Sequence, residues 1–187
     1  MTDQQKYQVL EQFPRFEVRN YPAHVVAEVV VDGTFERAGN EGFRPLLDYI
    51  SGANNTRVKV SMTSPVVQEE VESQKIAMTA PVVQHAADDD GQYVVSFVMP
   101  DGFTINTIPT PTNERVQVRE VPAHKAAVLR FTGRWTAESY DERAAMLRVM
   151  AAEQGFTIDG PMRFARFNPP WTPWFMRRNE IIAPLAD

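Results

Sequence analysis

The chain has no cysteine and only three histidines among its 187 residues. The lack of cysteine excludes disulfide bonds, thiolate zinc sites, iron–sulfur clusters and a cysteine nucleophile. With histidine only at positions 24, 85 and 124, a histidine-rich metal site or a catalytic triad has few possible members. The sequence also lacks metal-spaced histidine pairs and a glycine-rich phosphate loop, so we predict no metal site and no catalytic residues.

Long apolar runs and an excess of basic residues are missing as well. No stretch approaches the ~18 apolar residues of a transmembrane helix, and no signal-peptide core follows Met1. We therefore expect a cytoplasmic protein with no membrane partner. The net charge of −5 disfavours nucleic acid as a partner. The hydrophobic share of 43% is that of a globular protein, and the length fits one domain over residues 1–187.

The sequence repeats an octapeptide at a constant offset of 100 residues. Glu-Val-Arg-Asn-Tyr-Pro-Ala-His at 17–24 returns as Gln-Val-Arg-Glu-Val-Pro-Ala-His at 117–124. The correspondence continues to the aromatic residues Phe35 and Trp135. We infer an internal duplication with repeat halves of about 15–100 and 115–185.

Each half begins with a strand, at about 24–31 and 125–131, and continues into a helix. The first helix carries one apolar face, and Pro45 lies either in the first turn of a short helix or at a kink of a longer one. That face consists of Phe43, Leu46, Leu47 and Ile50.

The second helix is predicted to begin at a capping box, Ser139-x-x-Glu142, and to end at Gly155. Its apolar face consists of Tyr140, Ala144, Leu147 and Ala151. Two further strands follow each helix, at about 57–63 and 92–99, then at 162–168 and 179–184. The prediction is an α+β fold of two pseudo-symmetric βαββ repeats, whose sheets form a distorted β-barrel flanked by two helices.

Three segments resemble the SOUL haem-binding protein family. They are Lys75-Ile-Ala-Met-Thr-Ala-Pro-Val, Gly42-Phe-Arg-Pro-Leu-Leu-Asp-Tyr-Ile-Ser-Gly, and Phe167-Asn-Pro-Pro-Trp-Thr-Pro-Trp-Phe-Met-Arg-Arg-Asn-Glu. With the opening Phe16-Glu-Val-Arg-Asn-Tyr, the resemblance covers about Tyr7 to Ile182, and it implies a single domain with the fold given above. It also implies non-covalent binding of haem or a related porphyrin.

In this family the porphyrin lies in a shallow apolar groove beside the first helix, and the loop with the Pro-Pro motif closes one side. Phe43 and Leu47 on the helix, and Thr172, Pro173 and Trp174 in the loop, match groove positions of the family. A porphyrin is a flat ring with two carboxylates, and this chemistry adds Trp171, Arg44 and Arg177. The predicted groove residues are Phe43, Arg44, Leu47, Trp171, Thr172, Pro173, Trp174 and Arg177.

An axial iron ligand is not expected from the histidines. Asn20 stands where some members of the family have a histidine, while His24 and His124 occupy equivalent repeat positions that favour a structural role. Met62 and Met78 lie on predicted strands and fit a core role. We therefore expect hydrophobic capture of the macrocycle without a strong bond between protein and iron.

Two classes of function stay open. The first is a non-enzymatic haem or porphyrin binder that acts as a buffer, carrier or sensor. The second is a GyrI-like small-molecule-binding domain or hydrolase that uses Glu180. The loop aromatics could also simply cap the barrel, and the run Arg177–Glu180 could be an internal charge network.

Overall fold

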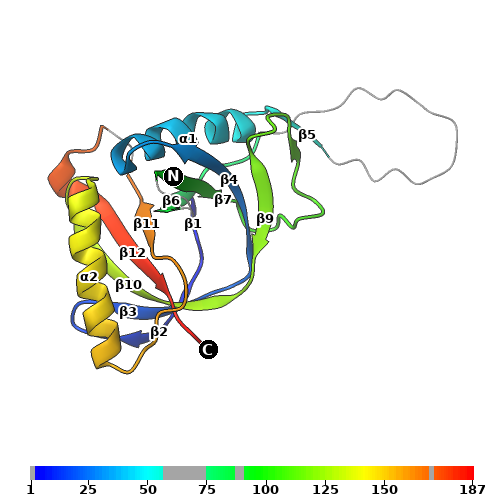
Figure 1. Cartoon of the computed structure of the whole chain (residues 1–187). Coiled ribbons are helices and arrows are strands. Elements are labelled where there is room, and N and C mark those ends of the chain that lie inside the picture. The colour runs from blue at the N-terminus through cyan, green and yellow to red at the C-terminus, as the bar shows by residue number, and fades with distance from the viewer. Residues whose placement is uncertain (1–2, 57–74, 87–90, 169–170) are drawn as a thin grey trace, which may run out of the picture.

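The computed structural model describes residues 3–56, 75–86, 91–168 and 171–187. Within these ranges, two helices lie outside one strongly curled sheet of ten strands (Figure 1). The helices are α1 (Phe35–Ile50) and α2 (Ala137–Glu153), with a short 3₁₀ turn η1 (Trp174–Met176). The sheet contains β1 (Asp3–Gln4), β2 (Gln8–Gln12), β3 (Glu17–Tyr21), β4 (His24–Asp32), β6 (Thr79–Ala86), β7 (Gln92–Val98), β9 (Gln117–Val121), β10 (His124–Thr132), β11 (Arg163–Arg166) and β12 (Arg178–Pro184). A separate pair is β5 (Asn54–Asn55) and β8 (Thr110–Pro111).

The strand order shows the duplication. It runs β2-β3-β10-β12-β11-β6-β7-β4-β9, with β1 beside β6. The two repeats meet where β11 pairs with β6, and each repeat gives its first strand to the other, so that β3 pairs with β10 and β9 with β4. His24 faces Val121 and His124 faces Tyr21, which is the same register shifted by 100 residues. The predicted fold of two βαββ repeats in a distorted barrel is confirmed.

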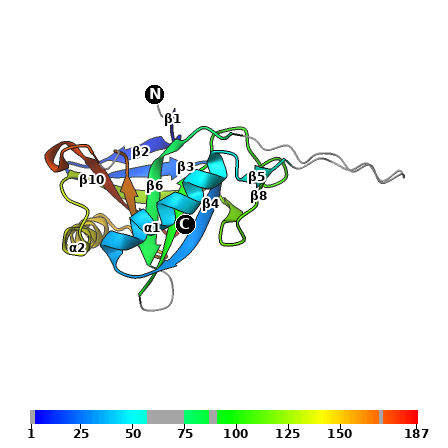
Figure 2. The same ribbon diagram turned by 90° about the horizontal axis from the view of Figure 1, so that it is seen from above.

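Each helix covers its own part of the outer face of the sheet (Figure 2). Helix α1 packs on β4 and β7, and α2 packs on β10 and β12. The predicted apolar faces form these contacts, since Leu46 and Ile50 are buried under α1, and Leu147 and Ala151 are buried under α2. Gly42 allows α1 its close approach, because a Cβ there would lie 2.6 Å from Val95 Cβ.

The structure decides where α1 starts and corrects the start of α2. Helix α1 begins at Phe35, so Pro45 lies inside a longer helix and not in its first turn. Helix α2 is capped by Thr136, whose side chain accepts a hydrogen bond from the Ser139 backbone N–H. The predicted cap, Ser139, lies one turn inside the helix, because Thr136 already has the extended backbone that an N-cap needs. Gly155, with a positive φ, follows the end of α2 as predicted.

Other strand predictions agree with the structure where it can be compared. The strands at 92–99, 162–168 and 179–184 appear as β7, β11 and β12. The strand at 57–63 lies outside the described residues, as do Met62 and Pro65. Because proline cannot donate a hydrogen bond to a sheet, the sequence predicts that Pro81 marks a sheet edge or a strand end. The structure instead places it at an irregularity within β6, which is another place where a sheet tolerates proline.

Candidate functional site: a crevice of arginine and tryptophan

A crevice of about 530 Å³ opens on the helix-bearing side of the sheet. Four segments border it: the first half of α1, the loop between β10 and α2, the end of β11, and the segment around η1. Its lining residues are Glu36, Asn40, Arg134, Trp135, Thr136, Arg166, Trp174 and Arg177. The volume lies within the ~300–1,000 Å³ typical of small-molecule sites.

Trp135 forms the floor of this crevice and is held from several sides. The guanidinium carbons of Arg166 and Arg177 lie 4.8 and 4.2 Å from its ring centroid. Its Nε1–H donates to Asn179 Oδ1 at 2.6 Å, and the Asn179 amide in turn donates to the Gly133 carbonyl. These contacts fix both the ring and the two cations that stack on it.

Arg166 is the most deeply buried charge of the crevice, with 8% of its surface exposed. Its Nη2 donates to Gln84 Oε1 at 3.1 Å, while its buried Nε has no hydrogen-bond partner among the described residues. Burial lowers the pKa of Arg166 to about 10, and the charge of Arg177 adds to this effect. The group is still a cation at neutral pH, and it has a donor left for an anion.

Gly39 provides the space in which this guanidinium lies. A Cβ at position 39 would come within 2.2 Å of Arg166 Nη1, so any side chain on α1 at this point would displace the arginine. The start of α1 is also fixed to the start of α2, since Glu36 Oε1 accepts from the Ala137 backbone N–H at 2.8 Å. That hydrogen bond lowers the pKa of Glu36. The crevice therefore has walls that are already positioned.

The segment around η1 forms the outer wall. Trp174 lines the crevice with half of its surface exposed, and Arg134 lies 5.5 Å from its ring. Arg177 Nε donates to the Thr172 carbonyl at 2.7 Å, which closes the turn that carries Trp174. Pro173 is the N-cap residue of η1 and is exposed.

The other predicted groove residues lie outside this lining. Phe43 and Leu47 are half-buried and pack against the core under α1, and the Phe43 ring lies 5.3 Å from that of Phe97. Arg44 is exposed on α1, one turn beyond Asn40. Trp171 is 84% exposed. The structure thus brings Trp174 and Arg177 together with residues of α1, but not with Phe43, Arg44 or Leu47.

Sequence reasoning missed the centre of the crevice. Arg166 stands in a strand of otherwise buried residues, and Gly39 stands inside a helix where glycine is unfavourable. Both are anomalies visible in the sequence. Trp135 was noted only as the repeat partner of Phe35, although a tryptophan N–H inside a protein calls for a polar partner such as Asn179.

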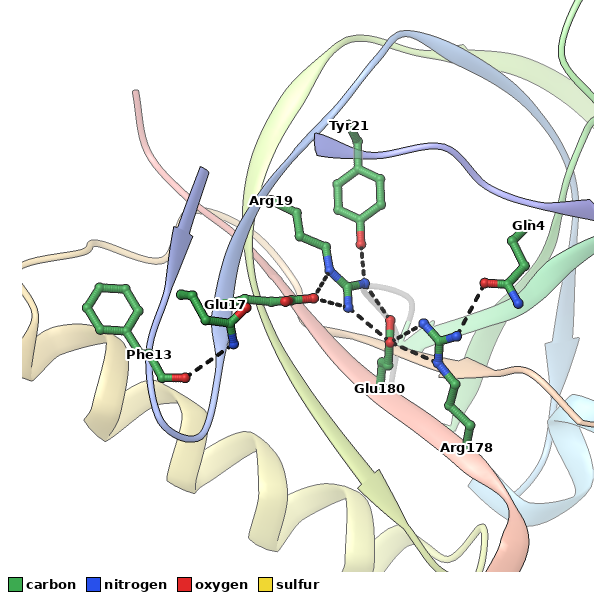
Figure 3. Close-up of polar contacts among 8 residues, drawn as sticks. Gln4, Phe13, Glu17, Arg19, Tyr21, Arg178 and Glu180 are labelled. Atoms are coloured by element: carbon green, nitrogen blue, oxygen red, sulfur yellow. Dashed lines mark hydrogen bonds and ion pairs between the residues drawn. The ribbon is translucent and has the colours of Figure 1, made fainter. Parts of the chain in front are cut away.

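Glu180, the residue of the hydrolase alternative, is fully buried inside the barrel in a charge network (Figure 3). Arg19 Nη1 donates to its Oε2 at 2.7 Å, and Arg178 Nη2 donates to its Oε1 at 2.8 Å. Arg19 also forms an ion pair with Glu17 and donates to the Tyr21 hydroxyl, and burial raises the pKa of Tyr21 to about 12. The hollow next to Glu180 measures about 10 Å³, too small for a substrate, so the hydrolase alternative is not favoured.

The histidines have the expected structural equivalence. His24 and His124 begin β4 and β10, and their Nδ1 atoms lie 2.9 Å from the carbonyl oxygens of Pro22 and Pro122. The acidic run Asp88–Asp90 that follows His85 in the sequence predicts an exposed side chain, but the structure shows His85 half-buried on β6. Met78 packs against the core, as expected. In the described part of the chain, no group of three or more histidine, aspartate or glutamate residues could hold a metal ion.

Comparison with known protein families shows which family the chain belongs to. The model of the SOUL heme-binding protein family matches residues 2–74 and 67–184. The chain belongs to this family. Heme-binding protein 1 of Xenopus laevis is 27% identical over 168 residues, which cover 89% of this chain and 81% of that protein.

Solved structures of low identity share the fold. The C-terminal domain of EcmrR has a TM-score of 0.62 at 13% identity, over 97% of this chain and 98% of that one. A hydrolase from Listeria innocua has a TM-score of 0.56 at 11% identity, over 95% and 94% of the two chains. These likenesses concern the fold alone. Within the described ranges, neither helix has the length and apolarity to cross a membrane.

Proposed function

We propose that this chain binds haem or a related porphyrin non-covalently in the crevice around Trp135, without catalysing a reaction, and acts as a haem buffer, carrier or sensor. Membership of the SOUL heme-binding family and the name of the Xenopus relative support the choice of ligand. The single observation that carries the proposed site is the stack of Arg166 and Arg177 on Trp135 beside an open volume of about 530 Å³.

The ligand chemistry fits the residues that line the crevice. A porphyrin is a flat apolar ring with two carboxylates at one edge, so it needs an aromatic wall and neighbouring cations. Trp174 offers a half-exposed ring, while Arg134, Arg166 and Arg177 bring three guanidinium groups to the same hollow. The unsatisfied Nε of Arg166 indicates that this group is not fully used by the protein itself. Arginine pairs well with carboxylates because its donors are arranged in a planar fork.

These residues have distinct roles in the proposal. Arg166 and Arg177 bind the carboxylates, Trp135 orients both cations, and Trp174 covers one face of the ring and excludes water. Arg44, which is exposed on α1, extends the binding surface, and Trp171, Thr172 and Pro173 belong to the loop that closes it, whereas Phe43 and Leu47 support α1 from the core side. Haem would supply iron chemistry when bound, and among the described residues that line the crevice there is no histidine.

A haemin titration tests the proposal. Addition of haemin to the purified full chain is expected to produce a saturable, one-to-one Soret shift. Arg166→Met should lower the affinity about 10–100-fold, because a charge-assisted hydrogen bond contributes ~1.5–3 kcal/mol. Trp174→Ala should lower it about tenfold, the equivalent of one lost aromatic contact. Arg148→Met, a substitution on the exposed side of α2, is the control and should bind as the wild type does.

Two results would contradict the proposal, and they are separable. If the wild-type chain gives no saturable shift, the function is wrong. If it binds, but Arg166→Met and Trp174→Ala keep their circular dichroism and bind with wild-type affinity, the ligand lies elsewhere.

A further inference from the structure

A second hollow lies on the opposite, concave face of the sheet, inside the curl in which β1 lies (Figure 1). Arg163 and Arg166 both belong to β11, but an odd separation of three residues turns their side chains to opposite faces. Arg163 therefore lines the concave hollow together with His24, His124 and Arg119, whereas Arg166 lines the crevice.

The concave hollow has a positive charge that the protein does not balance. Arg119 is neutralised by Glu28, since its Nε lies 2.9 Å from both carboxylate oxygens. Arg163 forms no hydrogen bond or ion pair with any described residue, although it is only partly accessible. Burial lowers the pKa of Arg163 and the neighbouring charge of Arg119 adds to this effect, while Tyr21 and Glu28 act in the opposite direction and offset it only in part. An anion placed beside it would supply the missing partner.

The two histidines of the hollow, His24 and His124, are uncharged, so they leave Arg163 as the group that attracts an anion. Their rings lie 6.0 Å apart, and each Nδ1 is paired with a proline carbonyl oxygen, so the neutral tautomer has its proton on Nδ1 and leaves Nε2 as an acceptor. His24 Nε2 is bonded to the Gln5 amide at 3.1 Å. Burial lowers the pKa of both rings, and the charge of Arg163 acts in the same direction, so they are neutral at pH 7.5. One cation thus stands in a hollow with otherwise neutral walls.

The shape of the hollow limits the size of the anion. The space at Arg163 measures about 30 Å³ and is bounded by aliphatic side chains such as Val26, Val121 and Ile182. It adjoins a wider hollow of about 320 Å³, because Gln5, His24 and Val98 line both. Met99 and Pro100 continue the apolar side of this wider hollow next to Val98, and its outer side carries the ion pair of Lys6 with Asp101. A porphyrin ring does not fit the inner space, whereas a single carboxylate with a narrow apolar tail fits both parts.

We propose that the concave face binds a small organic carboxylate, with its acid group at Arg163 between His24 and His124 and its apolar tail in the wider hollow next to Val98. This site is separate from the haem crevice and does not depend on it.

The three histidines make the site measurable by NMR, because each gives one imidazole Cε1–Hε1 signal. Hexanoate is titrated into the full chain at constant pH 7.5, and hexanol of the same chain length is the uncharged control. The signals of His24 and His124 are expected to shift saturably with hexanoate, whereas the signal of His85, which does not line the hollow, should stay in place. Hexanol should bind at least tenfold more weakly.

Variants test whether Arg163 is the cation that binds the carboxylate. Arg163→Met should lower the hexanoate affinity at least tenfold and leave the haemin titration unchanged, while Arg163→Lys should lose less. Arg166→Met should leave hexanoate binding unchanged. The proposal is overturned if the His24 and His124 signals do not move, if His85 moves equally, if hexanol binds as well, or if Arg166→Met is the variant that abolishes binding. The wild-type titration decides these points even if Arg163→Met does not fold.

Discussion

Gly39→Ala is the sharpest test of how the crevice is built. Alanine normally favours a helix interior over glycine by ~1 kcal/mol, so the substitution should stabilise α1 if nothing else changed. At this position, however, the new Cβ would lie 2.2 Å from Arg166 Nη1 and 2.7 Å from its Cζ. The guanidinium is the end of a long side chain, so it should move and leave the helix intact.

The cost follows from the contacts that Arg166 would lose. Its hydrogen bond to Gln84 joins a charged donor to a buried amide, which is worth ~1.5–3 kcal/mol, and its stack on Trp135 adds ~1 kcal/mol. Alanine in the helix offsets ~1 kcal/mol of this loss, so we expect Gly39→Ala to lower the free energy of unfolding by about 2 kcal/mol. In an Arg166→Met background nothing blocks the methyl group, and the same substitution should stabilise by ~1 kcal/mol.

Urea unfolding of the wild type, both single variants and the double variant gives the four free energies of unfolding that a double-mutant cycle needs. The expected coupling energy is about 3 kcal/mol, well above the error of such cycles. Gly42→Ala is the matched comparison: its clash is with Val95 on β7, so its effect should not change with residue 166. If Gly39→Ala stabilises the wild-type chain as much as the Arg166→Met chain, the contact between helix and arginine is not as described.

Three further outcomes are expected. Because burial lowers the pKa of His24 and His124 below that of the unfolded chain, the unfolded state binds more protons; stability is highest above pH ~6.5 and falls as the pH drops through the folded pKa values. Replacing both by glutamine should flatten urea stability between pH 7 and 5, and an unchanged slope would contradict this. Glu180→Gln should cost about 3 kcal/mol in urea unfolding, because the buried Arg19 and the partly buried Arg178 lose a shared counter-charge, and a loss below 1 kcal/mol would refute it. Trp171→Ala should reduce haemin affinity less than Trp174→Ala, and the reverse order would place the ring at the loop tip.

The fold was largely predictable because the two copies of the repeat lie at a constant offset in the sequence. Residues 17–24 and 117–124 fold into the same strands with the same register, and the helix stripes at Leu46 and Leu147 point to the sheet as their spacing requires. The helix starts were less predictable. An N-cap depends on the backbone of a single residue, and Thr136 and Ser139 are both good candidates by side-chain chemistry.

The candidate site was harder to predict, because it depends on which side chains meet across the sheet. Trp174 is predicted by a motif and Arg177 by the chemistry of the ligand, but Arg166 comes from a different strand, and only the pairing of β11 with β6 and β12 brings it to them. Phe43 and Leu47 were assigned to the groove edge, yet a helix that packs on a sheet needs those residues for its own burial. Helical spacing predicts a shared face but not its distance from a loop 130 residues away.

The repeats themselves point to where function was added. The offset of 100 between β4 and β10, carried through the registers of β7 with β12 and of β6 with β11, places corresponding residues of β6 and β11 at an offset of 80. Arg163 and Arg166 therefore match Val83 and Ala86 of the first repeat. Arg163 and Arg166, the two arginines on which the proposed sites depend, stand where the second repeat departs from the first. A buried cation costs stability unless it is paired, so its presence in only one repeat favours a role in binding over a role in folding.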